Sequence, residues 1–282
     1  MIGQFGPFGP FLLCARQELV LSVRSRWTQI FAAVFALLAL GVSSSGYVLS
    51  GGYGVQDFAR TAASLVELVL LLVPLTALVI GVLSLAPERG AAELLFSQPV
   101  SRRAILLGKG AGLFVALAAA QALGFGAAGL VIFSRAGGAG LPGFALLVLG
   151  SFVLTAVFLG VAALISAGTV GRRTRALAIA LVVWFGAVVL FDVAALGVAS
   201  LLPSGPASRV LIVSVLVNPA DAVRTGALLG IEGSGAFGAA SLALLRFTRG
   251  PVGAGLLLAA SLLLWMVAPA LLAARRLGKA DL

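Results

Sequence analysis

The chain has 282 residues, of which 61% are hydrophobic and 10% charged, and its mean hydropathy is +1.17. Soluble domains use roughly 45–50% apolar residues, so this composition predicts an integral membrane protein. A net charge of +10 would suggest nucleic acid as the partner of a soluble chain, but here the bases lie between apolar runs, so we expect no nucleic-acid partner. With no His and a single Cys, Cys14, we expect neither a metal site nor a disulfide framework.

The segment before the first apolar run, residues 8–26, has apolar side chains at helical spacing. Leu12, Ala15, Leu19 and Val23 share one face, and arginines occupy the others. This pattern predicts an amphipathic helix on the cytoplasmic membrane surface, with its bases near anionic headgroups. An unstructured basic tail is the alternative.

Six apolar runs are long enough to cross a hydrocarbon core of about 30 Å as helices. They lie at residues 27–49, 62–85, 104–133, 144–167, 176–202 and 252–274. Thirteen Lys and Arg residues flank these runs on one side and six on the other, so the positive-inside rule places both termini in the cytoplasm. The sequence therefore predicts an all-α membrane protein with six transmembrane helices in one transmembrane domain, residues 1–282.

Two acids fall inside these runs, where charge is costly. Glu67 lies in the second run and Asp192 in the fifth, and the expected topology places both in the outer half of the membrane. They could face a shared cavity or a dimer seam, or they could form local salt bridges with Arg60 or Arg224. We leave both interpretations open.

The cytoplasmic connection at residues 87–103 concentrates charge between two apolar runs. Pro87 and Pro99 bracket eleven residues, which predicts a short helix between them, and Ser101 is a suitable N-cap for the next helix. An ordinary basic loop that fixes topology would require only Arg102 and Arg103. A short helix held between two membrane spans is better suited to transmitting force from a soluble partner. Its candidate contact residues are Glu88, Glu93, Leu94, Leu95, Arg102 and Arg103.

The outer region, residues 203–250, contains the apolar stretch VLIVSVLV at 210–217. Eight residues cannot cross a bilayer, and Asn218–Pro219 ends the stretch. We expect a periplasmic loop that contains one or two short interfacial helices.

The connection has a recognisable residue order, with Glu88 and Gly90 followed by Leu94–Leu95, Pro99, Arg102, Ile105 and Gly108–Lys109. This order resembles the first coupling element of ABC-2 type permeases, the membrane subunits of ATP-binding-cassette transporters. The amphipathic helix and the six spans also match that family. The resemblance implies a bacterial cytoplasmic membrane protein whose coupling helix docks on a separate ATPase, and that partner would bind ATP and Mg²⁺.

Three further patches resemble one branch of this family, the permeases of the copper-processing system that matures nitrous oxide reductase. They are ARQELVLSVRSRW at 15–27, VWFGAVVLFD at 183–192 and NPADAVRTGALLGIEGSG at 218–235. The branch implies a homodimer, a periplasmic β-helical partner and delivery of copper or a sulfur species to the reductase. The residues expected to contact that periplasmic partner are Asn218, Pro219, Asp221, Arg224 and Glu232.

The chain also lacks the marks of an enzyme. GKG at 108–110 is not a phosphate-binding loop, because Arg103 stands where the first glycine belongs and Gly110 where a hydroxyl belongs. We therefore expect no ATP hydrolysis and no cofactor in this chain, and we rank a membrane enzyme last. A generic ABC-2 exporter of a lipid, drug or peptide remains an alternative, and so does a membrane scaffold that transports nothing.

Overall fold

A computed structural model describes residues 9–49, 54–86, 100–169, 171–232 and 239–279. Helices dominate, and none of the described residues is in a strand. The elements are α1 (Gly9–Arg24), α2 (Arg26–Leu49), α3 (Gly54–Leu85), α5 (Arg102–Ala136), a 3₁₀ turn (Gly137–Gly140), α6 (Leu141–Gly168), α7 (Arg173–Phe185), a π-helical turn η2 (Gly186–Leu190), α8 (Phe191–Ser200), α9 (Ser204–Val217), α10 (Pro219–Glu232), α11 (Ala239–Thr248) and α12 (Pro251–Lys279).

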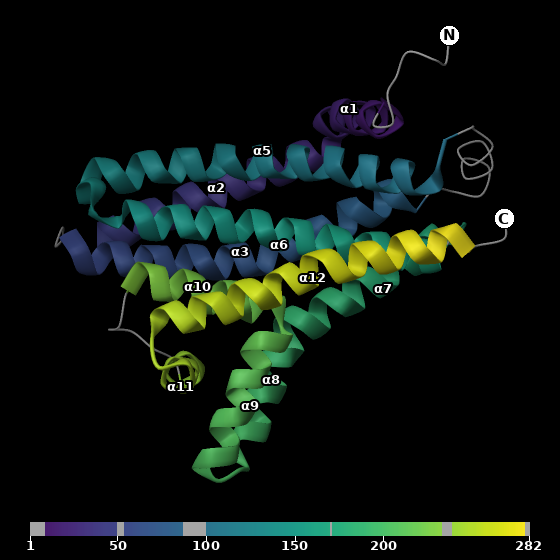
Figure 1. The fold of residues 1–282 in the computed structure, drawn as a ribbon. Helices are drawn as coiled ribbons and strands as arrows, with labels where there is room; N and C mark the ends of the chain where they lie inside the picture. Colours follow the sequence, from purple (N-terminus) through teal and green to yellow (C-terminus); the bar gives the residue numbers. More distant parts are fainter. Residues whose placement is uncertain (1–8, 50–53, 87–99, 170, 233–238, 280–282) are drawn as a thin grey trace.

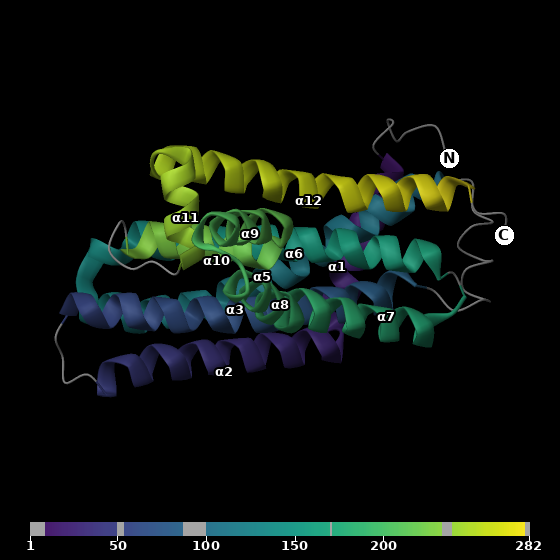
Figure 2. The same cartoon turned by 90° about the horizontal axis from the view of Figure 1, so that it is seen from below.

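Long helices run side by side along one axis, and α3 and α6 lie between α2, α5 and α12 (Figures 1 and 2). Six helical segments within the described residues are long and apolar enough to cross a membrane, which confirms the predicted architecture. They are Arg26–Ser45, Arg60–Leu85, Arg102–Ser134, Leu141–Gly168, Arg173–Ser200 and Pro251–Gly278. The first described helix and the C-terminal end of α12 lie at the same end of the bundle. We call this the inner end and the opposite one the outer end.

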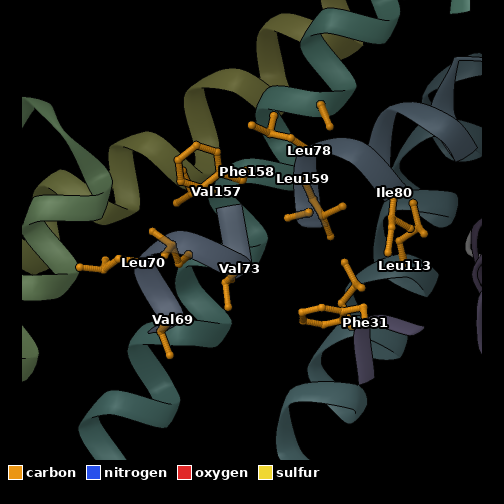
Figure 3. Close-up of a cluster of buried hydrophobic side chains, with 14 of the residues drawn as sticks. Phe31, Val69, Leu70, Val73, Leu78, Ile80, Leu113, Val157, Phe158 and Leu159 are labelled. Atoms are coloured by element: carbon orange, nitrogen blue, oxygen red, sulfur yellow. The ribbon is translucent and has the colours of Figure 1, made fainter. Parts of the chain in front are cut away.

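The core of the bundle is apolar and small residues bring its helices close together. Figure 3 shows Phe31 of α2, Val73 of α3, Leu113 of α5 and Phe158 of α6 among the side chains of this core. At Gly81, an added Cβ would lie 2.7 Å from the Cβ of Ala162, so α3 and α6 require a glycine at this contact. Such close approach of small residues is how membrane helices associate without a hydrophobic driving force.

The first helix, α1, runs across the bundle at its inner end (Figures 1 and 2). Leu12 and Val23 are exposed, as expected for a helix on a membrane surface, while Glu18 and Ser22 are buried against the bundle. The helix predicted for residues 8–26 therefore has two distinct faces, and the predicted apolar face is only one of them. A second face, carrying a buried acid, fixes α1 to the protein.

The outer region differs from the prediction. Residues 203–250 contain three helices, α9, α10 and α11, where we expected a loop with one or two. The break at Asn218–Pro219 is confirmed, because α9 and α10 meet there at 101°. The expectation failed because α10 is rich in small residues, and Ala220 and Ala227 let it pack into the bundle against α3 and α6.

Candidate functional site

Arg224 of α10 is the centre of an ionic cluster in the outer half of the bundle. Its Nη1 lies 2.5 Å from Oδ2 of Asp192 and 3.1 Å from Oδ1 of Asp221, and its Nε lies 3.3 Å from Oε1 of Glu67. These four residues, the outer cluster, connect α3, α8 and α10. Both acids that the sequence placed inside the membrane therefore meet on one arginine, as one of the two open interpretations required.

Asn218 organises the start of α10 beside this cluster. Its Oδ1 accepts a hydrogen bond of 3.0 Å from the backbone N–H of Ala220, which caps the helix, and Pro219 suits the first helical position. Its Nδ2 donates to the backbone oxygen of Ala187 at 2.8 Å and to Oδ2 of Asp221 at 3.3 Å. Ala187 lies in the π-helical turn η2, an irregularity that is frequent at functional sites.

A cavity of about 210 Å³ adjoins the outer cluster between α8, α9, α10 and α11. Asp192, Asp221 and Arg224 form its charged wall. The remaining lining is apolar or hydroxylated and consists of Ala195, Leu196, Leu211, Ser214, Val215, Thr225, Leu228, Ala240 and Ser241. Asp192 therefore faces a cavity and also forms a salt bridge with Arg224. The two interpretations left open by the sequence, a cavity and a local salt bridge, both apply to this residue.

A second ionic cluster lies at the inner end, and we call Glu18, Ser84 and Lys109 the inner cluster. Lys109 Nζ is 3.4 Å from Oε2 of Glu18 and donates a hydrogen bond of 2.8 Å to the backbone oxygen of Ser84. The Ser84 hydroxyl donates to Oε1 of Glu18. The Ser22 hydroxyl, one turn along α1, also donates to Oε1 of Glu18, at 3.5 Å. The Glu18 side chain is only 7% exposed, so this buried carboxylate depends on these polar partners. The cluster connects α1 with α3 and α5.

Two glycines on α5 allow α1 to approach closely enough for this contact. An added Cβ at Gly108 would lie 2.7 Å from the Cβ of Cys14, and one at Gly112 would lie 2.9 Å from the Cβ of Glu18. This four-residue spacing places both glycines on one face of α5. The glycines thus determine how deeply Glu18 sits.

The residues predicted for ATPase contact are only partly described. Glu88, Glu93, Leu94 and Leu95, with the helix expected between Pro87 and Pro99, lie outside the described residues. Ser101 Oγ accepts a hydrogen bond of 3.3 Å from the N–H of Ala104, which confirms the predicted N-cap. Arg102 donates to the backbone oxygen of Leu277 in α12 at 3.3 Å, whereas Arg103 is exposed.

The residues predicted to contact a periplasmic partner divide into two groups. Asn218, Pro219 and Asp221 are buried, so the structure gives them roles inside this chain and not on a docking surface. Arg224 is part of the outer cluster, and Glu232 is the last residue of α10. Within the described part of the chain, no three His, Cys, Asp or Glu side chains are grouped as ligands for a metal ion.

The inner cluster was missed as a site by sequence reasoning, although a signal existed. Glu18 is the one acid of the predicted amphipathic helix, and Lys109 is a base displaced several residues into an apolar run. Burying either charged side chain alone would cost free energy. An acid and a base in such apolar surroundings therefore indicate an ion pair. The sequence alone does not show that α1 folds back on α5.

The fold and the two clusters define a multi-pass helical membrane protein in which one long helix, α3, reaches an ionic contact near each end of the bundle. Comparison with known sequences gives the family: residues 12–282 match the ABC-2 family transporter protein, and the chain belongs to that family. A permease of this kind is the membrane subunit of an ABC transporter and implies an ATPase partner.

Two relatives carry the same name, probable ABC transporter permease protein NosY. The protein from Stutzerimonas stutzeri is 36% identical over 235 residues, which cover 81% of this chain and 85% of the relative. The protein from Pseudomonas aeruginosa is 34% identical over the same length and the same shares. The similarity therefore extends over most of this chain and most of each relative.

Proposed function

We propose that this chain is a NosY-like permease that couples ATP hydrolysis by a separate ATPase to a periplasmic partner during copper-site maturation of nitrous oxide reductase. The names of the two relatives support this branch of the family. The observation that carries the coupling role is the course of α3. It holds Glu67 in the outer cluster and Ser84 in the inner cluster, and it ends at Leu85, just before the predicted coupling element.

This arrangement offers a mechanical route through the membrane. Glu67 and Ser84 are seventeen residues apart on one helix, about 25 Å along its axis. A force applied by the ATPase to residues 87–103 would move the inner end of α3, and Arg224 would pass the movement from Glu67 to α10 and α8. The membrane is the bacterial cytoplasmic membrane, with the inner end in the cytoplasm, and the working unit is a homodimer.

The chain transmits motion or moves a non-metal species such as a sulfur compound. With no His, one Cys and only two Met residues, its side chains are poor ligands for copper passing through the bundle. Copper would instead be handled by the periplasmic β-helical partner. ATP and Mg²⁺ belong to the ATPase.

Co-purification tests the partners. The chain is tagged at its C-terminus, native membranes are solubilised gently, and every recovered protein is identified by mass spectrometry. We expect an ABC ATPase together with a periplasmic β-helical protein. Recovery of the ATPase alone would refute the copper-processing assignment in favour of a generic exporter, and recovery of neither would refute the coupling role as well.

Two variants assign the roles of residues. Leu94→Asp with Leu95→Asp should abolish recovery of the ATPase while the permease stays in the membrane, because the two leucines are the proposed apolar anchors. Asp192→Asn should impair reductase maturation and leave the ATPase bound. Normal maturation in the second variant would remove Asp192 from the proposed route.

A further inference from the structure

The cavity beside the outer cluster has a charged end and an apolar end. Helices α8 and α9 run side by side, and α10 and α11 complete its wall (Figure 1). Asp221, Arg224, Thr225 and Leu228 line it from one face of α10, because they stand at positions i, i+3, i+4 and i+7 of that helix. Asp192 adds a second carboxylate from α8. Charged, hydroxyl and apolar groups are therefore brought to one cavity.

The charged end carries more negative than positive charge. Asp192 and Asp221 share the single guanidinium of Arg224, which is also paired with Glu67. No other base forms an ion pair with these acids in the described part of the chain. The contact between Arg224 and Asp192 uses Oδ2, which leaves Oδ1 of Asp192 for another donor. A cation that enters the cavity therefore meets uncompensated negative charge.

Two buried hydroxyl groups at this cavity have no hydrogen-bond partner among the residues that the structure describes. They belong to Thr225, which is 4% exposed, and to Ser241 of α11, which is 7% exposed. A threonine hydroxyl within a helix can donate to the carbonyl four residues earlier, as those of Thr155 and Thr248 do. A buried polar group without a partner costs free energy, so the two hydroxyls indicate a ligand that supplies the missing hydrogen bonds.

The rest of the lining is mostly apolar, and the cavity is larger than a bare ion needs. Leu196, Leu211 and Leu228 contribute to this part of the wall. The volume is about 210 Å³, whereas a cavity of about 150 Å³ holds a benzene molecule. A sodium ion would leave the apolar part unfilled, and water would leave the surplus charge without a counterion. The ligand therefore needs a cationic end that donates hydrogen bonds and a short apolar body.

We propose that this cavity binds a small organic monocation, a primary ammonium group attached to a short apolar body. The ammonium group has three N–H donors, and Oδ1 of Asp192 and the hydroxyls of Thr225 and Ser241 are the acceptors that match them. A phospholipid headgroup fits less well, because its phosphate would lie close to the same carboxylates. This site is additional to the proposed coupling function and does not depend on the copper-processing assignment.

Fluorine NMR with 4-fluorobenzylammonium measures binding to the full chain in nanodiscs of phosphatidylcholine, a lipid without a primary ammonium group. The neutral compound 4-fluorobenzyl alcohol has the same body and no charge, and empty nanodiscs report partition into lipid. We expect saturable binding of the amine at one site per chain and binding of the alcohol that is weaker by at least about tenfold. Equal affinities for the amine and the alcohol would overturn the proposal.

The hydroxyl groups are tested by Thr225→Val and Ser241→Ala. Each substitution should weaken binding of the amine about tenfold, and it should not lower the unfolding temperature, because the lost hydroxyl has no partner within the described chain. Thr28→Val is the matched control, since the Thr28 hydroxyl on α2 is also buried and unpartnered in the described structure but does not line the cavity. Equal affinities in the Thr225→Val and Thr28→Val proteins would contradict the site.

Asp192→Asn tests the charge. This variant should bind the amine at least about tenfold more weakly and bind the alcohol as before, whereas an unchanged affinity for the amine would overturn the role of the surplus acid. Competition identifies other occupants. Displacement of the amine by an equal concentration of sodium ions would assign the cavity to an inorganic cation, and displacement by phosphatidylethanolamine in the nanodiscs would assign it to a lipid headgroup. Either result overturns the proposal and leaves the proposed coupling function standing.

Discussion

The inner and outer clusters both connect α3 to its neighbours, yet they differ in charge balance and in access. The inner cluster pairs one acid with one base, and its carboxylate is 7% exposed. The outer cluster opposes three acids to one arginine, and the exposed fraction of its acids reaches 64% at Glu67. A buried ion pair with balanced charge is suited to holding neighbouring helices in a fixed arrangement, as a rigid joint. An unbalanced, partly open cluster can gain or lose a partner.

This contrast fits the tasks proposed for the two ends. A joint between α1, α3 and α5 keeps the helices that flank residues 87–99 in a constant arrangement, so that movement is not lost within the subunit. At the outer end the surplus negative charge favours an incoming positive group, and the energy of that contact depends on the position of α3. The difference therefore predicts distinct responses to mutation.

Removing the arginine of the outer cluster should have the largest effect. Arg224→Met leaves three carboxylates with no guanidinium, and loss of one partner from a buried ion pair costs about 3–5 kcal/mol. Because the side chains of Arg224 and Asp192 are 28% and 25% exposed, we expect the lower end, about 3 kcal/mol. Thermal unfolding in detergent, followed by size exclusion, measures the loss.

Arg246→Met is the matched control for this prediction, because Arg246 is exposed and belongs to neither cluster. Its unfolding should match that of the unchanged chain. A similar stability of the Arg224→Met and Arg246→Met proteins would show that Arg224 is not the centre of the cluster.

The inner cluster should behave as a coupled pair. Glu18→Gln and Lys109→Met each remove a charged hydrogen-bonding partner, at a cost of about 2 kcal/mol. The double variant should cost at least about 1 kcal/mol less than the sum, because no charge is then left alone. The same unfolding assay measures this cycle. Strict additivity would show that Glu18 and Lys109 do not interact.

The sequence predicted the membrane architecture well, because a hydrophobic run of membrane length has few alternatives to a helix. It also singled out the acids Glu67 and Asp192, since charge inside a span is rare, and left their role open. It did not show that the third acid, Asp221, joins them. That contact depends on the 101° bend at Asn218–Pro219, which returns α10 into the bundle.

The outer region was misread for a related reason. Helix α10 packs through alanines and glycines, which give no strong hydrophobic signal, so its residues resembled a surface loop. Asn218, one of the residues expected to meet a periplasmic partner, is instead buried and caps α10. A motif that resembles one of a known family does not distinguish a docking residue from a helix cap.

The close approach of α1 can be tested without altering a charge. Gly112→Ala adds a methyl group that would overlap the carbonyl oxygen of Ala15 and lie 2.9 Å from the Cβ of Glu18. Displacing α1 should cost about 1–2 kcal/mol, typical of an overpacked contact. Gly110→Ala is the control, because nothing lies within 4 Å of its added Cβ. Equal unfolding temperatures for the two proteins would mean that α1 yields freely and that the inner cluster is not a fixed joint.

The smallest effect should come from a polar contact that does not involve α3. Gln121 of α5 donates a hydrogen bond of 2.7 Å to the hydroxyl of Thr155 on α6, and both side chains are buried. Hydrogen bonds between membrane helices contribute about 0.6 kcal/mol on average, so Thr155→Val should lower stability by about that amount. It should also leave ATP hydrolysis by the bound ATPase unchanged, whereas Glu18→Gln should lower it. If Thr155→Val reduced ATP hydrolysis as much as Glu18→Gln, buried polar contacts in general would affect coupling, and the two clusters on α3 would hold no special position.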